Sequence, residues 1–116
     1  MVDASATIEA RDGWLLVVQH GRLGDLDEAR ALQAKVLHAC DARGSRRVLF
    51  DNRDTEPPAD DVRDAMFEWA VTELERAALL LRSDLKRVRA NMDALSRRGR
   101  VRAFVVEHEA IAWLLR

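Results

Sequence analysis

The stretch RRVLFDNRDTE, residues 46–56, decides the fold of this 116-residue chain. Its centre, residues 48–50, is a continuous apolar run flanked by charge, which is typical of a strand buried on both faces of a parallel sheet. Asp51, Asn52 and Asp54 follow, and because short polar side chains hydrogen-bond local backbone, they predict that the strand ends there in a turn. In open α/β sheets, ligands and partners dock at this carboxyl edge. We therefore expect a central strand with a functional polar end.

Length and composition predict one domain, residues 1–116, large enough to bury about two-thirds of its unfolded surface. The single cysteine, Cys40, excludes an internal disulfide, and no basic segment followed by a long apolar run marks a signal peptide. The longest strongly apolar run, residues 77–81, is far shorter than the roughly 20 residues that a membrane helix needs. We therefore expect a cytoplasmic protein without a transmembrane segment.

Turn and cap signals divide the chain into alternating strands and helices. An Asp-Gly turn at residues 12–13 predicts an opening hairpin, and Asp25 with Glu28 resembles a capping box that starts a helix. The predicted elements are strands at 6–11, 14–18, 48–50, 77–81 and 101–106, and helices that begin near residues 26, 60, 84 and 107. The order ββαβαβαβα predicts an α/β fold, with a mostly parallel four- to five-stranded sheet, an N-terminal hairpin and about four helices.

Each predicted helix carries apolar residues at three- and four-residue spacing, which predicts one buried face on each, and the first and third helices show this most clearly. The stripe of the first helix is Ala29, Leu32, Val36, Leu37 and Cys40. The stripe of the third helix is Leu85, Val88, Met92 and Leu95. We expect both stripes to face the sheet.

Charge is unevenly distributed along the chain. Residues 1–81 carry 10 basic and 16 acidic side chains, a net charge of -6, whereas residues 82–102 carry 8 basic and 2 acidic side chains, a net charge of +6. A solvated basic helix face explains this asymmetry. The alternatives are attraction to an acidic partner or a membrane surface, and self-association. A nucleic-acid interface is not expected, because aromatic residues are not interleaved with the basic ones.

The chain resembles the STAS superfamily, specifically its SpoIIAA-like branch, sometimes called STAS/SEC14. The residues that carry the resemblance are Trp14 with the hairpin, the strand VLFD at 48–51, and the ending VRAF at 101–104 followed by EAIAWL at 109–114. The resemblance spans nearly the whole chain. It implies a bacterial, non-enzymatic signalling or scaffold domain that binds another protein, in the best-known members a kinase-type anti-sigma factor.

Those anti-sigma factor antagonists carry an Asp-Ser-(Ser/Thr)-Gly turn at the start of the second helix, where serine phosphorylation adds charge at the interface. This chain has DNRDTEPP at 51–58, with no serine and no glycine. The phosphoserine switch is therefore not carried over. Thr55 is the nearest hydroxyl and the weak candidate for a phosphoacceptor, although its residue type favours a turn or cap role.

No catalytic, metal or cofactor site is expected from the residue pattern. Cys40 lies on an inward stripe, and His38, two positions away, faces elsewhere. Glu107, His108 and Glu109 are consecutive at a helix start, so their side chains diverge. The acidic residues of 51–64 form a candidate Mg²⁺ pocket, but helix capping explains most of them.

The predicted interaction surface is therefore the end of the central strand and the start of the second helix, together with the neighbouring face of the third. Its residues are Asp51, Asn52, Arg53, Asp54, Thr55, Asp60 and Asp61. A different hypothesis is a carrier of a lipid or other apolar ligand, in a groove lined by Met66, Trp69 and Trp113. A third is a homodimer or scaffold held by opposite charges.

Overall fold

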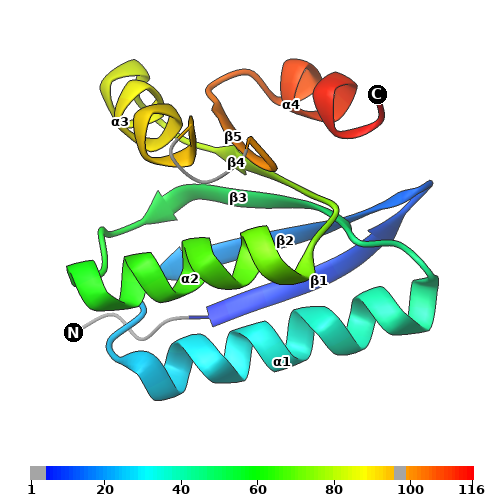
Figure 1. The fold of residues 1–116 in the computed structure, drawn as a ribbon, viewed down its shortest axis with the longest axis horizontal. Helices are drawn as coiled ribbons and strands as arrows, with labels where there is room; N and C mark the ends of the chain where they lie inside the picture. The colour runs from blue at the N-terminus through cyan, green and yellow to red at the C-terminus, as the bar shows by residue number, and fades with distance from the viewer. Residues whose placement is uncertain (1–4, 96–98) are drawn as a thin grey trace.

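The structure, a computed structural model, describes residues 5–95 and 99–116 and has a five-stranded sheet with strand order β1-β2-β3-β4-β5. The first two strands pair antiparallel, and every later pair is parallel (Figure 1). In chain order the elements are β1 (Ser5–Arg11), β2 (Trp14–Gly21), α1 (Leu26–Arg43), β3 (Arg47–Thr55), α2 (Asp60–Glu73), β4 (Arg76–Leu80), α3 (Asp84–Leu95), β5 (Val101–Phe104) and α4 (Glu107–Leu114). This order confirms the predicted α/β fold class.

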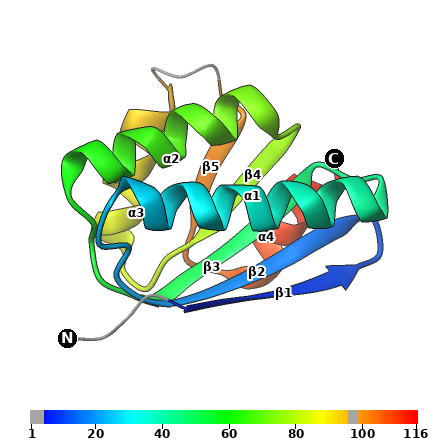
Figure 2. The ribbon, with the colours of Figure 1, turned by 90° about the horizontal axis from the view of Figure 1, so that it is seen from below.

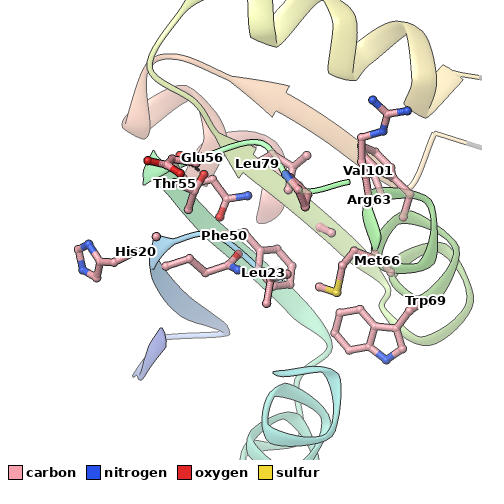
Figure 3. Close-up of a pocket in the computed structure, with 17 residues that line it drawn as sticks. His20, Leu23, Phe50, Thr55, Glu56, Arg63, Met66, Trp69, Leu79 and Val101 are labelled. Carbon is pink, nitrogen blue, oxygen red and sulfur yellow. Dashed lines mark hydrogen bonds between the residues drawn. The ribbon is translucent and has the colours of Figure 1, made fainter. Parts of the chain in front are cut away.

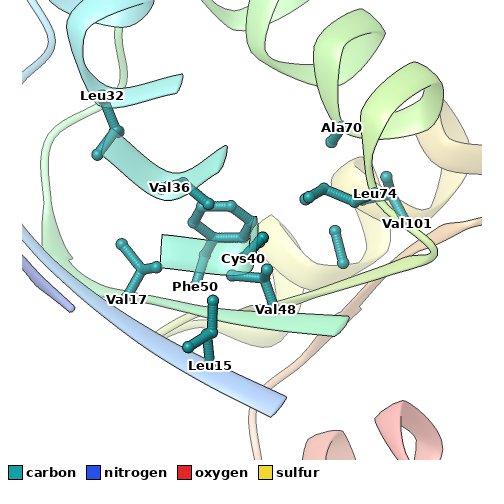
Figure 4. Packing of buried hydrophobic residues seen from close by; sticks show 11 residues of the cluster. Leu15, Val17, Leu32, Val36, Cys40, Val48, Phe50, Ala70, Leu74 and Val101 are labelled. Atoms are coloured by element: carbon teal, nitrogen blue, oxygen red, sulfur yellow. The ribbon is translucent and has the colours of Figure 1, made fainter. Parts of the chain in front are cut away.

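The helices form a layer on each side of the sheet. Helices α1 and α2 cover one face, whereas α3 and α4 lie on the other, with α3 beside the last strand, β5 (Figures 1 and 2). Because side chains alternate along a strand, the strands β2 to β5 each contribute to two cores, whereas β1 contributes to one. Val48 and Phe50 of β3 pack toward α1 and α2 (Figure 4), and Leu49 packs toward α4. The predicted central strand is thus buried on both faces.

Helix α1 begins and ends as its sequence predicts. The Asp25 carboxylate accepts a hydrogen bond from the Glu28 amide at 2.9 Å, and the Glu28 carboxylate accepts one from the Gly24 amide at 2.5 Å. Gly44 ends the helix in the left-handed conformation, with φ of 66°, which glycine adopts without a Cβ clash. Between these caps, Ala29, Leu32, Val36 and Cys40 of the predicted stripe are buried, and Leu37 is half-buried.

The end of β3 differs from the prediction. The strand does not end at Asp51 but continues to Thr55, through the residues that were expected to form a turn. The reason is that β2 also continues to Gly21, so that His20 pairs with Asp54 and Gly21 with Thr55 after a register shift between Val18 and His20. The available parallel partner therefore outweighs the turn preference of Asp and Asn.

Helix α3 also differs from the prediction. Leu85, Val88 and Met92 were expected to face the sheet, but their side chains are 64%, 41% and 68% exposed. The helix instead turns its polar Asn91 to β5: the Asn91 amide donates to the Ala103 carbonyl at 3.1 Å and accepts from the Ala103 N–H at 2.7 Å. This pairing satisfies backbone groups at the edge of the sheet, as a neighbouring strand would. The Leu95 side chain lies outside the described residues.

Smaller differences concern element ends. Strand β4 begins and ends one residue earlier than predicted, and β5 ends at Phe104 rather than at residue 106. Ser83 caps α3, because its hydroxyl accepts a hydrogen bond from the Lys86 amide at 3.2 Å. The predicted end of this helix before Gly99 falls on residues 96–98, outside the described part of the chain. No helix among the described residues is long and apolar enough to cross a membrane.

Candidate functional site

The carboxyl edge of the sheet holds a group of polar side chains in contact through Asp54, which we call the edge cluster: His20, Asp54 and Arg82. Asp54, at the end of β3, lies 2.7 Å from His20 Nδ1 at the end of β2, and its other carboxylate oxygen lies 3.8 Å from the Arg82 guanidinium. The side chains of all three are exposed, at 68%, 47% and 71% for Asp54, His20 and Arg82. The edge cluster therefore joins two strand ends to the segment that precedes α3, and leaves its charges accessible to a partner.

Asp51 and Arg53 form a second ion pair on the same strand. The Arg53 guanidinium donates two hydrogen bonds to the Asp51 carboxylate, at 2.9 and 2.8 Å. Hydrogen bonding from Arg53 is the largest cause that lowers the pKa of Asp51, and the same bond raises the pKa of Arg53. The side chain of Asp51 is only 14% exposed, whereas that of Arg53 is 47% exposed. Arg53 is thus the member of the pair that a partner can reach.

Three of the other predicted interaction residues, Thr55, Asp60 and Asp61, have local structural partners. Thr55 Oγ1 donates to the Asn52 carbonyl at 2.8 Å, so its hydroxyl holds the end of β3. Asp61 accepts from the Val62 amide at 2.9 Å, and Asp60 lies 3.6 Å from Arg63 in the first turn of α2. These carboxylates lie at the positive end of the helix macrodipole, where negative charge is stabilising.

A half-enclosed cavity of about 140 Å³, which we call the α2 cavity, lies between α2 and the sheet (Figure 3). Its apolar walls include Leu23, Phe50, Met66, Trp69, Leu79 and Val101. Asn52, Thr55 and Glu56 line it where β3 ends. The cavity was expected as a groove that also included Trp113, but the structure places Trp113 with the core on the other face of the sheet, 5.8 Å from the Phe104 ring.

Helix α3 presents an exposed apolar surface, the α3 stripe, formed by Leu85, Val88 and Met92. Its neighbours Lys86 and Arg89 are also exposed. The stripe follows directly after Arg82 of the edge cluster in the chain, so the two surfaces are neighbours. A grouped set of large apolar side chains at helical spacing is a mark of an interaction site, unlike single exposed apolar residues.

Candidate catalytic and metal-binding groups are dispersed. Cys40 is buried, and desolvation raises the pKa of its thiol, which disfavours the reactive thiolate. His38 and His108 are exposed on α1 and α4, on opposite sides of the sheet. Within residues 5–95 and 99–116, no group of three or more His, Cys, Asp or Glu side chains is arranged to hold a metal ion.

Sequence reasoning missed two members of the edge cluster, His20 and Arg82. A signal existed for His20, because it comes at the end of the strand that precedes the first helix. In parallel neighbours, strand ends meet at one edge of the sheet. Arg82 carried no separate signal, since it was one of eight basic residues between 82 and 102.

Comparison with known proteins shows the fold. No family model matches the chain, and no curated protein matches it. Among solved structures, an uncharacterized protein of the DUF3478 family with a SpoIIAA-like fold, from Shewanella loihica, superposes with a TM-score of 0.69 and 15% identity, over 96% of this chain and 93% of that one.

Two further structures are anti-sigma factor antagonists. The one from Mycobacterium paratuberculosis has a TM-score of 0.65 and 17% identity, over 98% of this chain and 96% of that one. Unphosphorylated SpoIIAA has a TM-score of 0.60 and 15% identity, over 96% of this chain and 98% of that one. The chain therefore has a SpoIIAA-like fold, as its sequence resemblance implies.

Proposed function

We propose that this chain is a cytoplasmic, non-enzymatic protein-interaction module that binds a regulatory protein through the α3 stripe and the adjoining edge cluster. The observation that carries the proposal is the orientation of α3. Leu85 and Met92, its most exposed large apolar side chains, are 64% and 68% accessible. A helix that holds its polar side against its own domain leaves its apolar side for another molecule.

Charge indicates the chemistry of the partner surface. Lys86 and Arg89 border the stripe, and Arg82 adjoins it. We propose that the partner presents an apolar patch surrounded by carboxylates. Complete burial of a leucine or methionine side chain contributes about 1.5–3 kcal/mol, so the stripe supplies the anchors. The charged rim then speeds association and selects among partners.

The similar structures suggest a class of partner. Two of them are named as anti-sigma factor antagonists, and we extend that role to this chain as a proposal: its partner is an anti-sigma-type kinase or another regulator. The proposal does not include a phosphoserine switch, because residues 51–58 contain no serine. Thr55 already donates its hydroxyl proton within the chain, which supports a structural role for this residue.

The test compares binding of captured partners by wild type and by matched variants. A tagged wild-type chain is used to isolate proteins from the cells that make it, and each isolated protein is then purified and titrated by calorimetry. We expect Leu85→Glu combined with Met92→Glu to weaken binding of the true partner at least about 100-fold, since both apolar anchors are lost. The control is Ala31→Glu with His38→Glu, two exposed α1 positions at the same seven-residue spacing.

Arg82→Glu supplies a second test. It reverses the charge of the exposed arginine that adjoins the stripe, and we expect it to weaken binding to a surface rimmed by carboxylates about tenfold. If every purified candidate binds the α3 variant, the Arg82→Glu variant and the control with the affinity of the wild type, the proposed surface is wrong.

A second copy of the chain is the competing partner, because the chain is acidic before residue 82 and basic after it. Contact between unlike surfaces of two copies is heterologous and tends toward open chains rather than a closed dimer. It predicts a mass by light scattering that falls as salt screens the charges. A monomer at low and high salt removes this alternative and leaves the proposed partner class.

A further inference from the structure

The α2 cavity has one polar feature that the fold itself does not use. Asn52 Oδ1 is buried and has no hydrogen-bond partner among the described residues. Asn52 also lines the cavity. A buried acceptor left without a donor costs about 1–3 kcal/mol, so native proteins rarely keep one without a purpose. Solvent does not reach Oδ1 in this conformation, so a rotation of the Asn52 side chain is needed to bring it to the cavity, where a ligand that donates a hydrogen bond recovers that loss.

The second buried polar atom without a partner in the described chain, Trp69 Nε1, belongs to another wall of the cavity. Trp69 faces the cavity with ring carbons, and its nitrogen lies on the side away from Met66 (Figure 3). At one end of the cavity, Asn52 carries the acceptor to which no described residue donates and lies among other polar lining residues, Gln19, Thr55 and Glu56. Trp69 forms an aromatic surface at the other end. The site therefore suits a molecule with a single polar group and an apolar body.

The size of the cavity limits the ligand. A volume of about 140 Å³ is close to that of an apolar protein cavity that binds benzene. Drug-sized ligands occupy pockets of roughly 300–1,000 Å³. The cavity therefore encloses compounds of one or two rings, whereas most of a long-chain lipid would lie outside it, which narrows the expectation of an apolar-ligand carrier to small ring compounds.

The walls favour a flat, neutral ligand. Phe50 and Trp69 meet edge to face, with ring centroids 6.4 Å apart and an interplanar angle of 74°, and Met66 adds a thioether that packs well against aromatic rings. The cation in the lining, Arg63, lies 3.6 Å from Asp60 and 3.8 Å from Asp64. Because nearby carboxylates balance this cation, an anionic group on the ligand would add little to the binding free energy.

We propose that the α2 cavity binds a small neutral aromatic molecule with one hydrogen-bond donor, of the phenol or indole class, which donates to Asn52 Oδ1. The body of the ligand packs between Phe50, Met66 and Trp69. This site lies on the α1 and α2 side of the sheet, whereas the α3 stripe lies on the other side (Figure 1). The two sites meet at His20, which lines the cavity and belongs to the edge cluster, whereas the apolar anchors of the α3 stripe lie away from the cavity.

The probes are phenol and toluene, which are similar in size, although only phenol can donate a hydrogen bond. Purified full chain is titrated with each, while the methyl signals of Met66 and Leu79 are followed by NMR. We expect saturable shifts of both signals in the wild type. Asn52→Ala should weaken phenol binding about tenfold and change toluene binding by less than about twofold, since only phenol loses a hydrogen bond.

A cavity-filling variant, Leu79→Trp, gives an independent check, because Leu79 lines the cavity. We expect it to abolish the binding of both probes. If Leu79→Trp does not fold, the comparison of wild type with Asn52→Ala still decides. The proposal is overturned if neither probe gives saturable shifts in the wild type, or if Asn52→Ala affects phenol and toluene binding alike.

Discussion

Helices α1 and α3 carry apolar stripes of the same spacing but orient them in opposite ways. In α1, Val36 is fully buried against the sheet, whereas in α3 the equally apolar Val88 is 41% exposed. Both helices begin with a hydrogen-bonded cap, from Asp25 and from Ser83. Local sequence thus starts both helices in the same way, and the difference in orientation has another cause.

The cause is the kind of surface that each helix packs against: apolar side chains for α1 and backbone groups at the edge of the sheet for α3. Helix α1 covers the apolar centre of β2 and β3, so that turning its stripe inward removes hydrocarbon from water. Helix α3 lies beside β5, whose outer backbone groups at Ala103 require partners. The Asn91 amide supplies both a donor and an acceptor for these groups, and the side of the helix that carries Asn91 therefore faces the sheet. Apolar periodicity predicts which residues share a face, but the neighbouring surface decides where that face points.

The largest predicted effect comes from a matched pair of leucines. Leu32→Ala on α1 should lower the free energy of unfolding by about 3 kcal/mol, because Leu32 is only 7% exposed and its removal leaves a cavity. Leu85→Ala on α3 should change it by less than about 0.5 kcal/mol. Urea unfolding followed by circular dichroism measures both. Equal losses from the two substitutions would contradict the exposed orientation of α3.

The next effect tests the contact that orients α3. Asn91→Ala leaves the Ala103 N–H and carbonyl without their partners, and we expect a loss of about 2 kcal/mol. Hydrogen exchange at the Ala103 amide should also become faster. Asn91→Asp is the control, because a carboxylate still accepts from the amide but no longer donates to the carbonyl. If Ala103 remains as well protected in Asn91→Ala as in the wild type, another contact orients the helix.

The smallest predicted effect concerns the ion pair of Asp51 and Arg53 at the carboxyl edge of the sheet. It tests whether this edge contributes to the stability of the fold, as the buried stripe of α1 does. Arg53 lowers the pKa of Asp51, so the pair stabilises the fold above the ordinary carboxyl pKa of about 3.9. This contribution is lost as pH falls through the lower pKa of the folded state. We expect Arg53→Ala to cost about 1 kcal/mol at pH 7, because the arginine is partly exposed, and much less at pH 2.

The measurement is urea unfolding at both pH values, and Arg30→Ala is the control. Arg30 is exposed on α1 and lies 3.7 Å from Asp27, a weaker pair. A cost that is the same at pH 2 and pH 7 would show that Arg53 does not act through the Asp51 carboxylate.

The order of elements could be predicted because each boundary has a local cause in the sequence. Asp12 with Gly13 forms the hairpin turn, and Asp25 and Gly44 limit α1 wherever the helix packs. The continuation of β3 beyond Asp51 could not be predicted in this way, because it depends on pairing with β2, which is distant in the sequence. The same limit applies to the stripe of α3, whose direction follows from one amide.

The candidate site was predictable in part for the same reasons. Met66 and Trp69 share a helical face, and the structure brings both to the α2 cavity. The sequence could not show whether Trp113 lines the α2 cavity. The answer depends on which face of the sheet α4 covers, and the path of the chain from β5 to α4 decides that face. Asn52 was expected at the edge as a surface residue. Because β3 continues to Thr55, Asn52 lies within the strand rather than in a turn, and its side-chain oxygen is buried.

The pairing of Asn91 with Ala103 has a consequence for assembly. An uncovered outer strand is a template on which strands of other molecules can add, and repeated addition leads to fibres. Here a side-chain amide occupies the template position on β5 at Ala103. At that point the sheet cannot grow by recruiting backbone from a second molecule. The α3 stripe is therefore exposed on a helix that also closes this part of β5 to uncontrolled polymerisation.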